Sequence, residues 1–547
     1  MISNLKLTLI SLTYIVTTVC EASVPQWSES YSVRGVLYLP YAEIEEPFHA
    51  WYNGPNGNSR IDFYDGMAKT YQLGADDYGT GIKIVPFTTE EVSNEITCFL
   101  VNGTEEEPVK SQSILPSLDD FQLEGTEGEG ESEMEIWSLT VQEMEKKNVY
   151  TMWVRYDSNN QPIPVKYDMK GYNTLLGSHY DHYYLEYDSY LIYQEGFPLG
   201  VFDVKFYECR SFPGPGNQHS HNINPMSEFI RPEKSEHVDH HFNEFIRAHN
   251  KQYSDVNEHV MRKDIFRQNF RFINSVNRQN RGYSLAVNHL ADKTNEEMKI
   301  LRGRIPNGGY NGGKPFPYKN VDSEDLPEQY DWRLYGAVTP VKDQAVCGSC
   351  WSFATVGHLE GALFLKKNNR TNLVRLSEQA LVDCSWGYGN NGCDGGEDFR
   401  SYQWILKHGG IPLDSDYGAY IGQDGYCHAD GLNKTASITG WVNVTVNDVN
   451  AHRLAIFKEG PISVSIDASQ KTFRFYSNGV YYDENCANGA DDLNHAVLAV
   501  GYGTMNGEDY WLIKNSWSTY WGNDGYILMS ARDNNCGVMT QATYVTM

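Results

Sequence analysis

The chain has 547 residues, a formal net charge of −27 and 40% hydrophobic residues. Its length exceeds one typical hydrophobic core, so we expect a multi-domain protein of about two or three domains. The negative charge argues against nucleic acid as a partner, because a phosphate backbone repels an acidic surface, and it is compatible with a secreted protein or one from an acidic organelle.

The first segment, residues 1–22, predicts a secretory signal peptide. Lys6 precedes an apolar run over 7–19, and residues 20–22 form an imperfect small-x-small cleavage site. The run is too short and too polar for a membrane anchor, and no later segment is apolar enough to span a bilayer. We therefore expect entry into the secretory pathway, with the choice between secretion and a lysosome-like acidic compartment left open.

Residues 23–215 predict an all-β antiparallel domain, built as a curved sheet or half-open barrel. Short alternating runs rich in Tyr, Trp and β-branched residues are separated there by Gly, Asn and Pro. An acidic, glycine-rich stretch over 118–131 cannot bury a core, so we expect a mobile loop. His179 and His182 would point to opposite faces of a strand, so we expect no shared metal ion.

Residues 216–237 predict a polar linker and candidate cleavage site, and from 238 the pattern becomes helical. Phe266, Asn269 and Ile273 recur at helical spacing, which an ordinary amphipathic helix would also explain. The wider set Glu258, Arg262, Phe266, Asn269, Ile273 and Asn277 matches the prosegment signature of cathepsin L-type zymogens. This resemblance implies that residues 238–325 are an inhibitory prosegment, which packs on a protease and passes through its cleft in reverse.

Residues 326–547 begin after a connector rich in Gly, Pro and Asn that we expect to be cut on activation. Within them, Cys350 opens an apolar run over 351–356 that predicts a buried helix. At the N-terminus of that helix, the dipole should lower the thiol pKa toward the reactive thiolate. Gln344 lies just upstream, and its side-chain amide can stabilise an oxyanion together with the backbone N–H of Cys350.

Far downstream, His495 begins a β-branched apolar run, and Asn515 and Trp517 follow it. Asn515 can accept a hydrogen bond from one imidazole nitrogen, which leaves the other to face Cys350 as general base and acid. Trp517 would shield this hydrogen bond from water. The three motifs agree in order and spacing with papain-family cysteine proteases, cathepsin L in particular.

This resemblance implies a two-lobed α+β protease, with one helical lobe and one β-barrel-like lobe. The implied activity is that of a cysteine endopeptidase, made as a latent zymogen and needing no cofactor or metal. It also implies the disulfides Cys347–Cys393, Cys384–Cys427 and Cys486–Cys536, which leave Cys98–Cys209 as a pair in the N-terminal region. Spacing alone does not choose these partners. The candidate glycan acceptors are Asn102, Asn369, Asn433 and Asn443.

The loop over 393–396 resembles the glycine loop of the family, where a peptide backbone approaches closely. The positions that resemble the S2 pocket are more polar and acidic than in cathepsin L. We hypothesise that a basic or polar P2 residue is tolerated better than in cathepsin L, unless Glu397 and Asp398 point to solvent. The candidate substrate-binding residues are Gly395, Gly396, Glu397, Asp398, Ser465, Leu493, Asn494, Gln541 and Trp517.

Two alternatives stay open at this point. A related acyl-transferase would use the same Cys–His–Asn set, and a binding protein would use the β domain as its main part, with a regulated protease attached. The layout resembles haemocyte-type cathepsin L-like proteases, in which a β domain accompanies the catalytic chain and can stay with it as a second chain. We also predict activation at acidic pH, because protonating carboxylates would loosen the ion pairs that hold the prosegment.

Overall fold

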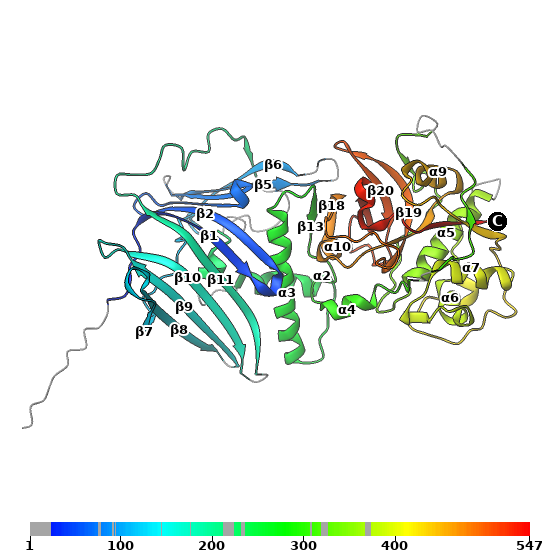
Figure 1. Cartoon of the computed structure of the whole chain (residues 1–547), viewed down its shortest axis with the longest axis horizontal. Coiled ribbons are helices and arrows are strands. Elements are labelled where there is room, and N and C mark those ends of the chain that lie inside the picture. The colour runs from blue at the N-terminus through cyan, green and yellow to red at the C-terminus, as the bar shows by residue number, and fades with distance from the viewer. Residues whose placement is uncertain are drawn as a thin grey trace, which may run out of the picture.

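The computed structural model describes residues 23–74, 78–89, 92, 94–143, 145–174, 177–211, 224–230, 236–306, 309–318, 326–366 and 373–547. A β domain, a helical segment and a two-lobed C-terminal unit follow one another along the long axis of the molecule (Figure 1). The predicted signal peptide and much of the predicted linker lie outside the described residues. Within the described ranges, no helix is long and apolar enough to cross a membrane.

The β domain is one twelve-stranded sheet with the spatial order β12-β6-β5-β4-β3-β2-β1-β11-β10-β9-β8-β7. Neighbouring strands are antiparallel, except that β12 pairs with β6 in parallel. Alternate residues of a strand face the core, as Tyr31, Val33 and Leu37 do on β1. This sheet is consistent with the predicted antiparallel architecture. The strands are β1 (Ser30–Leu39), β2 (Ile44–Asn53), β3 (Asn58–Phe63), β4 (Ala68–Leu73), β5 (Thr80–Phe87), β6 (Glu95–Asn102), β7 (Gln122–Glu127), β8 (Met134–Glu143), β9 (Lys146–Tyr156), β10 (Pro162–Asn173), β11 (Ser178–Ile192) and β12 (Cys209–Arg210).

The stretch predicted as a mobile loop is instead ordered, so that prediction is wrong. Leu118 and Phe121 are buried against the sheet, and β7 pairs with β8 along the sheet edge. The side chains of β7 are mostly exposed. An edge strand of this kind is held by backbone hydrogen bonds, so its acidic residues stay in water and need no core of their own.

The helical segment places its longest helix, α3, between the β domain and the C-terminal unit (Figure 1). One side of α3 carries Phe266 and Ile273 into the core. Another side carries Arg271, which is buried and ion-paired with Asp181 of β11. The helix is therefore covered on two sides. The segment comprises α1 (Ser227–Ile230), α2 (Glu236–Ala248), α3 (Val256–Asn277), β13 (Tyr283–Leu285) and α4 (Asn295–Ile300).

Side-chain caps fix where α3 and α4 begin. Asp255 accepts a hydrogen bond from the backbone of Glu258, and Thr294 and Glu297 form a reciprocal capping box. The carboxylate of Glu297 also accepts hydrogen bonds from the two terminal nitrogens of Arg262 on α3, at 2.7 and 2.9 Å. This bidentate pair ties α4 to α3.

The C-terminal unit has a helical lobe and a β lobe, as predicted. Helix α5, which starts at Cys350, is buried on almost all sides because it packs on α6 and α7 and on β17 and β19. The helical lobe contains α5 (Cys350–Lys366), α6 (Glu378–Cys384), α7 (Asp398–Lys407) and α8 (Asp414–Tyr417). The β lobe contains β16 (Gly440–Asn443), α9 (Val449–Glu459), β17 (Ile462–Ile466), α10 (Lys471–Phe475), β18 (Tyr476–Tyr481), β19 (His495–Met505), β20 (Glu508–Lys514), β21 (Tyr526–Ser530) and β22 (Ala542–Thr546).

The sheet of the β lobe has the order β13-β18-β21-β20-β19-β17-β22-β16-β14, with β15 beside β19. Its edge strand β13 comes from the helical segment and pairs with β18, so that segment is docked on the β lobe by backbone hydrogen bonds. The two short strands are β14 (Lys314–Pro315) and β15 (Tyr330–Asp331). The 3-10 turns are η1 (Pro40–Ala42), η2 (Tyr64–Gly66), η3 (Gly130–Ser132), η6 (Trp386–Tyr388), η7 (Gly392–Asp394) and η8 (Arg532–Gly537).

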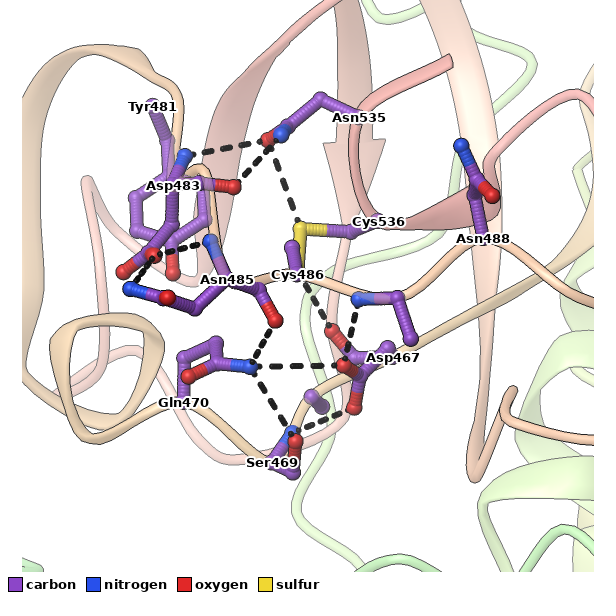
Figure 2. Close-up of a disulfide and its surroundings, with 12 residues drawn as sticks. Asp467, Ser469, Gln470, Tyr481, Asp483, Asn485, Cys486, Asn488, Asn535 and Cys536 are labelled. Carbon is purple, nitrogen blue, oxygen red and sulfur yellow. Dashed lines mark hydrogen bonds between the residues drawn. A yellow bond between two sulfur atoms is a disulfide. The ribbon is translucent and has the colours of Figure 1, made fainter. Parts of the chain in front are cut away.

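Disulfides join the same cysteine pairs that were named from the sequence. In the described part of the chain these are Cys98–Cys209, Cys347–Cys393, Cys384–Cys427 and Cys486–Cys536, and Cys350 is free. Figure 2 shows the Cys486–Cys536 bridge, which ties the loop before β19 to η8. Asp467 reinforces it, because its carboxylate accepts from the backbone of Ala487 at 3.0 Å and its own N–H donates to the Cys536 carbonyl at 2.9 Å.

Candidate active site

Three polar side chains meet where α5, β19 and β20 come together. Cys350 is the first residue of α5, His495 is the first residue of β19, and Asn515 directly follows β20. Because β19 and β20 are antiparallel neighbours, His495 Nε2 reaches Asn515 Oδ1 and donates to it at 2.8 Å. The Trp517 ring lies against the imidazole, with the ring centroids 4.9 Å apart. The Cys350 thiol faces the backbone N–H of Ala496, next to His495.

Gln344 is fully buried and its amide is in use. Its Nε2 donates to the carbonyl oxygen of Leu301 at 2.9 Å and to that of Cys347 at 2.8 Å. Ser516 Oγ donates to the Gln344 Oε1 at 2.7 Å, which fixes the orientation of the amide. A carbonyl from the helical segment therefore occupies the donor that the sequence assigned to an oxyanion.

The segment that covers these groups is residues 301–305, called here the cleft segment. Gly396 N donates to Gly303 O at 2.8 Å, and Ile305 N donates to Gly396 O at 3.1 Å, so Arg304 forms a parallel bridge with Gly396. A Cβ atom at Gly303 would collide with the carbonyl oxygen of Gly348. Only a residue without a side chain fits at this crossing.

Burial under the cleft segment sets the charge of Cys350 and His495. It raises the pKa of the Cys350 thiol to about 11 and, despite the hydrogen bond to Asn515, lowers the pKa of His495 to about 4. Both groups are neutral near pH 7. The expectation of a thiolate is therefore wrong for this covered state, because loss of solvent outweighs the helix N-terminus. Removing the cleft segment would restore solvent and allow the pair to ionise.

Arg304 fills the pocket beside Gly396. Its Nη1 donates to the carbonyl oxygens of Ala490, at 3.1 Å, and Leu493. Its Nη2 donates to Gln541 Oε1 and lies 3.1 Å from Glu397 Oε1. Of the predicted substrate-binding residues, those that contact the cleft segment are Gly396, Glu397, Leu493, Asn494 and Gln541.

Of the other predicted substrate-binding residues, Gly395, Asp398 and Ser465 lie around this pocket, whereas Trp517 lies against His495. Asp398 accepts from Thr543 Oγ1 at 2.6 Å, and together with Ser465 and Tyr310 it lines a cavity of about 190 Å³. Gly395 has a left-handed φ of 118°, and a Cβ atom there would come within 2.6 Å of the Gly303 carbonyl oxygen.

Sequence reasoning missed two contributors to the pocket. The backbone carbonyl of Ala490 carries no side-chain signature. Arg304 could have been found only by matching a cation in the connector with the acidic residue after the glycine loop.

The candidate glycan acceptors differ in accessibility. Asn102 and Asn433 are exposed. The amide of Asn443 exchanges hydrogen bonds with that of Asn311, at 2.8 and 2.9 Å, so it is engaged in this packing. Asn369 lies outside the described residues. Across the ranges the structure describes, no group of three or more His, Cys, Asp or Glu is arranged to hold a metal ion.

Known proteins resemble the chain from the helical segment onward. Residues 326–546 match the family described as papain family cysteine protease. Residues 242–298 match the cathepsin propeptide inhibitor domain (I29). Digestive cysteine proteinase 2 of Homarus americanus is 42% identical over 306 residues, which are 55% of this chain and 92% of that protein. Cathepsin S of Mus musculus is 40% identical over 316 residues, 56% of this chain and 90% of that protein.

Solved structures give the same result. Digestive procathepsin L 3 of the Tenebrio molitor larval midgut is 38% identical with a TM-score of 0.52, covering 57% of this chain and all (100%) of that one. The recombinant stem bromelain precursor is 34% identical with a TM-score of 0.51, covering 57% of this chain and 99% of that one. Both family matches begin after the β domain.

Proposed function

The chain belongs to the papain family of cysteine proteases, and we propose that it is an endopeptidase whose reaction is carried out by Cys350, His495 and Asn515. It is a thiol protease made as a zymogen with a cathepsin-type propeptide. The observation that carries the proposal is the contact of the Leu301 carbonyl with the Gln344 amide beside Cys350. The prosegment thus places a peptide carbonyl on the donor that a scissile carbonyl would use.

The reaction follows from the positions of these groups. In the uncovered site, His495 Nδ1 takes the thiol proton, and Cys350 Sγ attacks the scissile carbonyl carbon. Gln344 Nε2 and the backbone N–H of Cys350 stabilise the oxyanion. His495 then protonates the leaving amine and activates the water that releases the acyl-enzyme. Asn515 holds the imidazole through its 2.8 Å hydrogen bond without adding a charge.

Proteolysis is better supported than the two alternatives. An acyl-transferase would use the same three residues, but the prosegment pairs with Gly396 as a peptide backbone does, which favours a peptide substrate. A protein whose main role is recognition by the β domain is less well supported, because the family matches cover the inhibitory and catalytic parts.

We further propose how the precursor is divided and where it acts. The units are a signal peptide (1–22), a β domain (23–215), a linker (216–237), a prosegment (238–325) and the protease (326–547). The β domain can stay bound as a second chain after cleavage. Digestive proteinases and cathepsin S among the relatives support a place in the secretory pathway, either secreted or in a lysosome-like compartment.

Incubating the full-length precursor at pH 4.5 and mapping its new N-termini tests this function. We expect a terminus near Leu326, hydrolysis of a peptide library and covalent labelling of Cys350 by an epoxide. Cys350→Ser should remove hydrolysis and labelling, and His495→Ala should lower kcat/KM by about 10²–10⁴-fold. Hydrolysis that persists in Cys350→Ser after repurification, or a matured wild type that is neither labelled nor active, would overturn the proposal.

A further inference from the structure

The pocket beside Gly396 already holds an arginine. The Arg304 side chain is 1% exposed and that of its ion-pair partner Glu397 is 5% exposed. A buried guanidinium is tolerated only where an opposite charge and hydrogen-bond acceptors surround it. Because the pocket meets this requirement for Arg304 of the prosegment, it has the properties of an arginine-binding site.

The positions of the acceptors match the planar, forked guanidinium group of arginine. Two backbone carbonyls, of Ala490 and Leu493, accept from Nη1, while Gln541 and Glu397 face Nη2. Each terminal nitrogen therefore has two oxygen partners. A lysine ammonium is a single point on a flexible stem and cannot face both sets at once, so this arrangement favours arginine over lysine.

All of these acceptors belong to the protease, so they stay when the prosegment leaves. The loop with Ala490 and Leu493 is anchored at its start by the Cys486–Cys536 disulfide (Figure 2). At its end, Asn494 Nδ2 donates to Asp467 at 2.8 Å, and Asn494 N donates to the Ile466 carbonyl at 3.0 Å. The carbonyls are thus held in place independently of Arg304.

Once the prosegment has gone, the Glu397 carboxylate loses its ion pair with Arg304. A substrate that brings a positive charge restores the pair, whereas leucine or phenylalanine leaves a carboxylate in an apolar contact, which is unfavourable. Asp398 faces Thr543 instead, so Glu397 is the carboxylate that discriminates.

We propose that the mature enzyme selects arginine at P2 and that Glu397 is the residue that determines this specificity. The inference rests on the proposed endopeptidase function and names its substrate class: peptides with arginine one residue before the P1 position. The substrate residue that pairs with Gly396 places its side chain where Arg304 lies in the precursor.

Fluorogenic peptides that differ only at P2, with arginine, lysine or leucine, test the proposal on the matured wild-type enzyme. Active-site titration with an epoxide gives the concentration of competent enzyme. We expect kcat/KM for arginine to exceed that for leucine by about tenfold or more, a difference of about 1.4 kcal/mol, with lysine between them. A leucine preference, or equal rates, would overturn the inference and leave the endopeptidase function intact.

A matched pair of variants then tests the residue. Glu397→Gln should lower kcat/KM for the arginine peptide at least tenfold and change the leucine peptide less than threefold, or raise it, because the pocket stays the same size. Asp394→Asn removes the same charge from an exposed position of the same loop and should leave the ratio of arginine to leucine unchanged. Equal loss for both peptides in Glu397→Gln would count against a specificity role. If no peptide is cleaved and Cys350 is not labelled, the proposed function itself fails.

Discussion

At Gly303 the prosegment crosses the loop before α5 at close range. A Cβ atom there would collide with the carbonyl oxygen of Gly348, and the same residue accepts the hydrogen bond from Gly396 N. Its backbone does not have a left-handed φ, so the requirement is for space and not for conformation. Two residues before this crossing, the carbonyl oxygen of Leu301 accepts the hydrogen bond from Gln344 Nε2.

Replacing this glycine should weaken latency. Gly303→Ala must push the cleft segment away from Gly348, at a cost of about 1–3 kcal/mol that the inhibitory contact loses. We expect the unprocessed precursor to react with an epoxide at pH 7 at least about tenfold faster than wild type. Gly309→Ala is the matched control, because a Cβ atom there meets nothing within 4 Å. Equal labelling of the two variants would contradict the argument.

The residues that we propose to react could be singled out from sequence because each starts a recognisable element. Cys350 opens an apolar helix and His495 opens a buried strand, and the family resemblance supplied their pairing. Their protonation states were not predictable. Those depend on burial under the cleft segment, including Leu301 and Gly303, which lies outside the sequence motifs around Cys350 and His495.

At the level of elements, α3 buries residues that its single apolar stripe does not predict. Phe266 and Ile273 mark the expected stripe, but Gln268 and Arg271 are also buried, because both donate to Asp181 of β11 at 2.9 and 2.8 Å. Polar residues on a helix usually face water. Here a charge on another domain receives them, and local sequence carries no sign of such a long-range pair.

Two histidines of the helical segment are placed to sense acid. His249 follows α2 and His289 precedes α4, and both rings contact Tyr520 of the protease, with centroids 4.9 and 6.0 Å apart. Burial lowers the pKa of His289 to about 3 and also lowers the pKa of His249. The charged groups facing them are Lys251, Lys293 and Asp292.

The sign of this shift gives a pH window. The docked prosegment favours neutral His289. The free energy of docking is therefore most favourable above the ordinary histidine pKa near 6.5, and this contribution is lost as the pH falls toward about 3. The carboxylate of Glu297 behaves differently. Although partial burial opposes charge, hydrogen bonds from Arg262 and the Thr294 backbone lower its pKa to about 2, so its stabilisation is lost only below about 4.5. Between pH 6.5 and 4.5 the histidines therefore release the prosegment, rather than the Glu297 carboxylate.

His289→Gln should accordingly shift activation to lower pH. The amide cannot take up a proton, so the variant precursor should need a lower pH than wild type for half-maximal processing in a fixed time. His240→Gln, on the exposed side of α2, is the control and should process like wild type. Processing curves for His289→Gln and wild type that coincide between pH 6.5 and 4.5 would refute the role of this histidine.

At the level of the whole molecule, the prosegment has two partners. Strand β13 docks it on the protease, and α3 docks it on the β domain. The second contact includes the Arg271–Asp181 ion pair, whose side chains are 5% and 3% exposed, and a pair between Arg278 and Glu46. A cut between 306 and 326 separates the protease from the rest of the chain. The two ion pairs between the prosegment and the β domain stay in place.

The β domain and the prosegment should therefore stay together after activation, even when the linker between them is also cut. Asp181→Asn removes one of the two carboxylates that pair with the buried guanidinium of Arg271 and leaves only Glu228 of α1, at 2.7 Å. Breaking a buried pair costs up to about 3–5 kcal/mol. With a specific protease site inserted into the linker, the two wild-type fragments should co-elute on size exclusion at pH 7, whereas those of Asp181→Asn should separate. Glu186→Gln removes a carboxylate from the same strand, β11, where it pairs with Lys166 at the surface, and should behave like wild type. Wild-type fragments that elute apart would show that the covalent linker, and not the buried charge, holds the two units together.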